Sequence, residues 1–137
     1  ISRAYQEGQI QGKPYIRRDW ITEAAKGLIV FAGRFSDVGQ ALLGDKTSQA
    51  KQLLSQWQAE FPGRFYLELT RTGRMGEESY IHRAVSLAAD TDCPVVATND
   101  GRFLSVDQFE AGEARVCIGE GRVLDDPRRE RRYSDRQ

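Results

Sequence analysis

Three short apolar segments decide the fold of this chain: LIVFA at residues 28–32, FYLELT at 65–70 and PVVAT at 94–98. Each is rich in β-branched or aromatic residues, a composition typical of strands that are buried on both faces. Segments with helical periodicity lie between them. This alternation predicts an α/β fold in which parallel strands are joined by right-handed crossovers.

Amphipathic helices are predicted between and after the strands. The apolar residues of 50–61 and of 77–89 recur at helical spacing, so both segments are predicted to pack on the sheet. Ser105 and Gln108 match a capping box, which predicts one more helix from about Val106 to Ile118. The first 18 residues are polar, contain glycine and proline, and are predicted to form a loop.

The composition is that of an ordinary globular chain. Lys plus Arg equals Asp plus Glu at 20 each, so the net charge gives no overall attraction to nucleic acid or anionic lipid. No apolar run approaches the roughly 18 residues that span a bilayer. Cys93 and Cys117 belong to no metal-binding spacing and are interpreted as reduced, buried thiols of a cytoplasmic protein. The alternative, a disulfide, would imply secretion.

Both ends of the sequence suggest a piece of a longer protein. It begins at Ile1 rather than at a methionine, and residues 128–136 form an arginine-rich run. Three strands make an incomplete sheet with unpaired edges, which favour association with other strands. We therefore expect the isolated chain to self-associate, or to cover these edges with its terminal segments.

Candidate site residues follow the strands, because sites in parallel sheets lie at the carboxyl ends of strands. Asp100 could hold a divalent metal or act as a base, although Asn99 and Asp100 also favour turns. Arg71 and Arg74 suit a phosphate or an acidic partner, with solvated loop charges as the commoner alternative. Glu68, inside a strand, needs a partner.

The single histidine, His82, cannot form a metal site by itself and is interpreted as a packing or surface residue. The sequence contains no glycine-rich phosphate loop of the P-loop or dinucleotide-binding type. It also offers no defensible Ser-His-Asp or Cys-His arrangement. Nucleophilic catalysis and nucleotide binding through a standard loop are therefore not indicated.

Several stretches together resemble the PHP (polymerase and histidinol phosphatase) domain of bacterial DNA polymerase III alpha subunits, closest to the proteobacterial type. The longest is FPGRFYLELTRTGR at 61–74, followed by EESYIH at 77–82. The strongest match is PVVATND at 94–100. Shorter matches at 19–20, 37–39 and 124–128 keep the same order, so the resemblance covers almost the whole chain.

The resemblance implies a partial (β/α)7-type barrel that lies at the N-terminus of the parent polymerase. Residues 1–118 would be the later part of the PHP domain, and residues 119–137 a connector toward the polymerase palm. Active members hold metal ions with His, Asp and Glu at the strand ends and hydrolyse phosphoesters. Matched residue by residue, Asp100 falls on a metal-ligand position, whereas Arg102 and Gly112 replace expected histidines.

An arginine cannot coordinate a metal, so the resemblance implies a degenerate domain without a cofactor in this segment. The resemblance still allows a divalent metal to bind in the intact family domain. The implied role is a structural and interaction module that docks the epsilon proofreading exonuclease subunit within the polymerase III core. DNA would be contacted through the parent protein, a DNA-directed DNA polymerase and nucleotidyltransferase of replication.

Two other interpretations stay open from the sequence. One is a residual metal-dependent phosphoesterase or 3′–5′ exonuclease that uses Asp100 with further ligands upstream of Ile1. The other is a free-standing nucleotide-binding α/β protein, which would require the phosphate loop that the sequence lacks. Beside these alternatives, we expect that this segment is not catalytic by itself.

Overall fold

The computed structural model describes residues 1–129 and 135. At its centre lies a three-stranded parallel sheet in the order β3-β4-β5. Its strands are β3 (Val30–Ala32), β4 (Phe65–Thr70) and β5 (Val95–Thr98). The three predicted strands and their parallel direction are confirmed, although β3 starts two residues later than expected.

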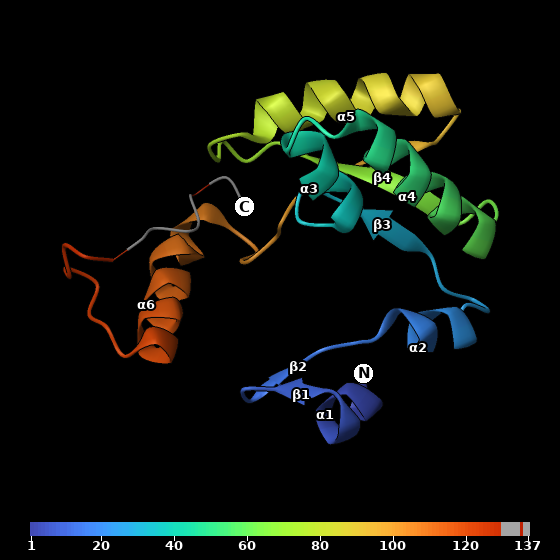
Figure 1. Ribbon diagram of the computed structural model, residues 1–137. Helices are drawn as coiled ribbons and strands as arrows, with labels where there is room; N and C mark the ends of the chain where they lie inside the picture. Colours follow the sequence, from blue (N-terminus) through green and yellow to red (C-terminus); the bar gives the residue numbers. More distant parts are fainter. Residues whose placement is uncertain (130–134, 136–137) are drawn as a thin grey trace.

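One face of this sheet is covered by helices, which Figure 1 shows grouped on the same side of β3 and β4. They are α3 (Asp37–Leu43), α4 (Thr47–Glu60) and α5 (Glu77–Thr91). The core between sheet and helices includes Leu54 and Leu67, both fully buried. Short helices alone are marginal in water, so this shared apolar core holds the three helices in place.

The predicted apolar stripe of α4 is confirmed, since Ala50, Leu54 and Phe61 are buried in the core. Of the residues predicted for the inner face of α5, Ile81, Ala84 and Ala88 are buried, and Val85 is exposed. Tyr80 is also buried on this face. A stripe repeats every 3.6 residues, and this spacing places Val85 just outside the edge of the buried face.

The prediction of an N-terminal loop is wrong. The segment forms α1 (Ser2–Glu7) and the antiparallel pair β1 (Gln9–Ile10) and β2 (Lys13–Pro14), and α2 (Arg18–Glu23) follows it. Gln11 and Gly12 both adopt positive φ, as the favoured two-residue hairpin turn requires. Arg18 pairs with Glu60 of α4 at 2.9 Å, which connects this N-terminal unit to the core.

The C-terminal part begins with a 3-10 turn, η1 (Val106–Gln108), followed by α6 (Phe109–Glu120), which lies apart from the sheet (Figure 1). The predicted capping box does not form. Ser105 makes no side-chain cap bond, and the Gln108 Oε1 accepts from the Leu104 N–H instead. The following segment folds back on α6, where Arg129 pairs with Glu113 at 2.5 Å.

Two further expectations concern cysteines and membranes. Cys93 and Cys117 are both unpaired and buried, as predicted. Burial raises the pKa of the Cys93 thiol, so this side chain behaves as a small apolar group. Within residues 1–129, no helix has the length and apolar character needed to cross a membrane.

Candidate functional site at the strand ends

A cleft of about 720 Å³ opens at the carboxyl ends of β3, β4 and β5. This is the edge of the sheet that the sequence indicated. The loops after all three strands contribute to its lining, and each contributes one arginine: Arg34, Arg74 and Arg102. Three carboxylates, Glu68, Glu77 and Asp100, also line the cleft. The cleft therefore holds a polar cluster whose charges come from segments far apart in the sequence.

Asp100 is held between two guanidinium groups. Its Oδ2 accepts a hydrogen bond from Arg74 Nη2 at 2.8 Å, and its Oδ1 pairs with Arg102 Nε at 2.8 Å. Partial burial acts to raise the pKa of this carboxyl, but hydrogen bonds and charges from both arginines outweigh it and lower the pKa. Asp100 is therefore an ionised carboxylate with both oxygens engaged.

Glu68 has the hydrogen-bonding partner that a carboxylate inside a strand requires. Its Oε1 accepts a hydrogen bond from the Thr98 hydroxyl at 2.7 Å, and that hydroxyl lies 3.2 Å from the Thr70 hydroxyl. Gly33 faces the same carboxylate, since a Cβ at Gly33 would stand 2.7 Å from Glu68 Oε2. A larger residue at 33 would thus displace Glu68 from the cleft.

Glu77, in the first turn of α5, is a site residue that the sequence did not single out. Its buried carboxylate accepts hydrogen bonds from Thr72 N–H and hydroxyl, Gly73 N–H and Arg74 N–H, at 2.8 to 3.1 Å. Burial opposes ionisation, but these four donors lower the pKa of Glu77 below its ordinary value. Glu77 thereby fixes the loop that carries Arg74. The available signal was a glutamate at a helix start, directly after a short polar loop.

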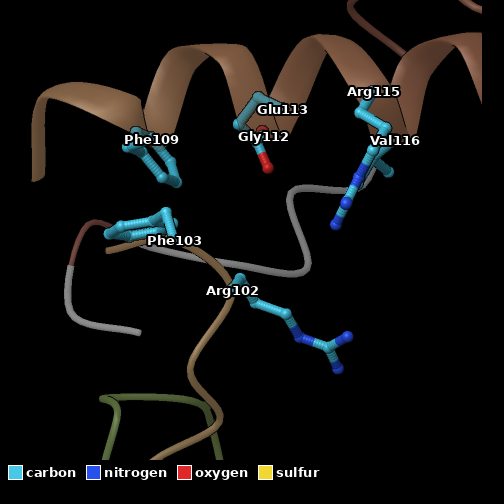
Figure 2. Close-up of a pocket in the computed structure, with 7 residues that line it drawn as sticks. All are labelled: Arg102, Phe103, Phe109, Gly112, Glu113, Arg115 and Val116. Carbon is cyan, nitrogen blue, oxygen red and sulfur yellow. The ribbon is translucent and has the colours of Figure 1, made fainter. Parts of the chain in front are cut away.

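Gly112 and Arg102, the two positions matched to missing histidines, line a second, smaller pocket of about 50 Å³. Figure 2 shows Phe103 and Phe109 against each other there, with ring centroids 5.8 Å apart. The volume is well below the roughly 300 Å³ of small-molecule sites. Asp100 does not line this pocket, so Arg102 alone is shared between it and the cleft.

The residues at the strand ends do not fit a metal centre by themselves. Among residues 1–129 and 135, no three side chains of His, Cys, Asp or Glu come together as a metal would require. His82 is exposed on α5 and does not line the cleft. Asp100 is the one sequence-predicted metal ligand in the cleft, and it binds arginines.

Comparison with known proteins identifies the family. The PHP domain model matches residues 1–72, more than half of the chain. The chain belongs to the PHP domain family. This match covers β3 and the whole of β4, and it ends before β5, so the expected PHP boundary at residue 118 stays a prediction.

PHP-containing polymerase subunits are similar over the whole chain. DNA polymerase III subunit alpha of Pseudomonas aeruginosa is 52% identical over 138 residues, that of Escherichia coli K12 48%, and that of Haemophilus influenzae 44%. Each alignment covers 100% of this chain and 12% of the relative. The resemblance to the PHP region of DNA polymerase III alpha subunits is therefore confirmed.

Proposed function

We propose that this chain is a degenerate PHP module of a DNA polymerase III alpha subunit, with a structural and docking role in place of catalysis. The observation that carries the proposal is the Arg74–Asp100–Arg102 cluster. Two guanidinium groups supply the positive charge that a metal ion would otherwise bring to Asp100. No metal or other cofactor is needed to complete this cluster.

Electrostatics support this reading. Two unit charges about 4 Å apart interact with roughly 4 kcal/mol near a protein surface. A divalent cation at Asp100 would have to displace both arginines and then remain near their charges. Arginine keeps its charge at any ordinary pH, so neither guanidinium group can lose a proton and let a metal ion bind Asp100 instead. The cluster therefore favours a permanent ion-pair network over metal binding.

The parent protein would be a replicative DNA-directed DNA polymerase, a nucleotidyltransferase of the cytoplasm. Its partners would be the epsilon exonuclease subunit and the rest of the polymerase III core, with DNA contacted elsewhere in the parent. The polymerase assignment is supported by the name that the relatives share, and the exonuclease partner is what the family resemblance implies. Residues 1–118 would form the later part of the PHP domain, and residues 119–137 a connector toward the palm.

The sheet would be part of a (β/α)7-type barrel completed by other segments of the parent. Helices cover one face only, and Phe31 on the other face is 50% exposed. Parallel sheets are ordinarily covered on both faces, which leaves this face to be covered by further chain. Without it, the isolated chain should self-associate through the edges of β3 and β5, and light scattering over a concentration series measures this.

The catalytic question is tested on the full-length alpha subunit by calorimetry with Zn²⁺ and Mn²⁺ and by a phosphoesterase assay. We expect no stoichiometric metal binding and no turnover assignable to this site. Asp100→Asn should lower the melting temperature, whereas Asp90→Asn, which loses only an exposed pair with Lys51, should not. Tight metal binding with turnover that Asp100→Asn abolishes would establish the phosphoesterase alternative instead.

The docking role is tested by hydrogen exchange of the full-length subunit with and without the exonuclease subunit. We expect amides within residues 1–129 to gain protection in the complex. Protection confined to the rest of the polymerase would reject the docking role while leaving the structural role in place.

A further inference from the structure

The same tripeptide pattern follows each strand of the sheet: glycine, arginine, then an apolar residue. The triplets are GRF at 33–35, GRM at 73–75 and GRF at 101–103. All three arginines line the strand-end cleft. The repetition places three cations at one edge of the sheet, each next to an apolar side chain.

Arg34 differs from the other two arginines because it has no ion pair within residues 1–129. Arg74 and Arg102 both pair with Asp100, whereas Arg34 is within ion-pair distance of no carboxylate in residues 1–129. Its Nη1 donates to the Met75 carbonyl at 3.0 Å, and its Nε is buried without an acceptor. Arg34 therefore lines the cleft as a cation without a direct ion pair among residues 1–129.

Two exposed apolar side chains flank this charge. Phe35 is 74% exposed and its ring lies 5.0 Å from the Arg34 guanidinium carbon, while Met75 is 94% exposed. The hydrogen bond from Arg34 to the Met75 carbonyl ties the two loops together before any partner arrives. Aromatic residues, methionine and arginine are enriched in protein interfaces, and pre-ordered loops lose less entropy on binding.

We propose that Arg34, Phe35 and Met75 form a docking surface for a protein segment that presents a carboxylate beside an apolar side chain. This inference rests on the docking role proposed above and names the surface of the chain that would serve it. A nucleic-acid strand fits less well, because such strands follow grooves with several available cations. Here two of the three arginines already pair with Asp100, which leaves Arg34 as the one cation of the three without an ion pair among residues 1–129.

The experiment measures the affinity of the full-length alpha subunit for the exonuclease subunit by calorimetry at two salt concentrations. Phe35→Ser and Met75→Ser should each weaken binding about tenfold, the effect of removing a well-packed interface side chain. Arg34→Gln should weaken binding and reduce its salt dependence. Matched controls are Ile118→Ser, an 80% exposed apolar residue on α6, and Arg115→Gln, an exposed arginine; neither should change the affinity.

Hydrogen exchange on the same complex separates failure of this surface from failure of the docking role. Protection at residues 34–35 and 74–76, together with the affinity losses, supports the proposal. Protection elsewhere in 1–129 with unchanged affinities overturns the surface but keeps the docking role. An absence of protection throughout 1–129 overturns both.

Three outcomes would assign the same residues to another occupant and so overturn the proposal. If Phe35→Ser and Met75→Ser lower the melting temperature of the free subunit, the parent's own chain covers them. If they weaken binding of a single-stranded oligonucleotide and leave the exonuclease affinity unchanged, the surface serves nucleic acid. If they abolish self-association and leave the exonuclease affinity unchanged, the surface serves a second copy.

Discussion

The two faces of the central sheet differ although they are made by the same strands. On β4, Phe65 and Leu67 point to the helices and are buried, while Tyr66 and Glu68 alternate with them and remain partly exposed. On the neighbouring strand, Ala32 is buried and Phe31 is half exposed. One face is thus completed within the chain, and the other is left open to solvent or to further chain.

The helix-covered face supplies stability, whereas the open face and the strand ends carry the candidate site. The helix-covered face buries the apolar core that makes the strands rigid. The open face and the strand ends carry polar and charged groups from three loops, held at fixed distances by that rigid sheet. Substitutions on the two sides should therefore have effects of different size and kind.

The largest effect is expected from Leu67→Ala on the helix-covered face. Leu67 is fully buried in the core, and removing its side chain there leaves a cavity that the helices cannot close. The free energy of unfolding should fall by about 2–5 kcal/mol. Urea denaturation measures this. A loss below about 1 kcal/mol would show that the helix-covered face is loosely packed and would remove the contrast between the faces.

Glu77→Gln should have the next largest effect, about 2 kcal/mol, because a buried carboxylate with four donors is replaced by an amide. The folded-state pKa of Glu77 is lowered. Its ionised form therefore contributes stability that is fully present above the unfolded pKa near 4.3 and is lost as pH falls through the folded pKa.

Denaturation curves of wild type and Glu77→Gln between pH 2 and about 7 test this linkage. The stability difference between the two proteins should shrink as the pH falls below about 4. A difference that stays constant across this range would mean that the charge of Glu77 does not order the loop.

Tyr80→Phe should cost about 1 kcal/mol, the net value of a typical hydrogen bond. The Tyr80 hydroxyl reaches from α5 through the covered face to the carbonyls of Ala32 at 3.1 Å and Glu68 at 3.0 Å. Burial, with a smaller effect from the Glu68 charge, raises the pKa of Tyr80, so the hydroxyl stays a donor at neutral pH. Thermal unfolding should show the loss, while Tyr66→Phe on the open face, whose hydroxyl contacts neither carbonyl, serves as the comparison.

The smallest effect is expected from Phe31→Ser in the 137-residue chain, below about 1 kcal/mol, because the side chain is 50% exposed. The same substitution should destabilise the full-length subunit by more than 2 kcal/mol if a barrel covers this face. Melting curves of both proteins give the two values. Equal small losses in both would contradict the barrel.

The sequence predicted the elements with strong local patterns and missed those without them. The strands at 65–70 and 94–98 are short runs of β-forming residues, and the α4 stripe repeats over several turns. By contrast, β1 and β2 have two residues each, too few to show any period. The Ser105–Gln108 capping box failed because Gln108 bonds to Leu104, an alternative of equal local plausibility.

For the candidate site, the sequence indicated its place and some of its residues but not their partners. Asp100 and Glu68 were recognisable as carboxylates at or inside strands. That Arg74 and Arg102 bind Asp100, and that Thr98 binds Glu68, depends on how three loops meet. Glu77 was not predicted because its role depends on four hydrogen-bond donors that converge on its carboxylate only in the folded loop.

The sequence by itself determined the α/β class, the three parallel strands, the membership in the PHP family and the absence of histidine from the key positions. The class and the strands follow from composition and local periodicity, which act along the chain, whereas the family and the histidine positions follow from the resemblance of its motifs. The tertiary structure alone decided that two arginines share Asp100 and that Arg34 has no direct ion pair among residues 1–129. Such pairings require parallel strands to bring distant loops to one edge, so no local pattern can encode them.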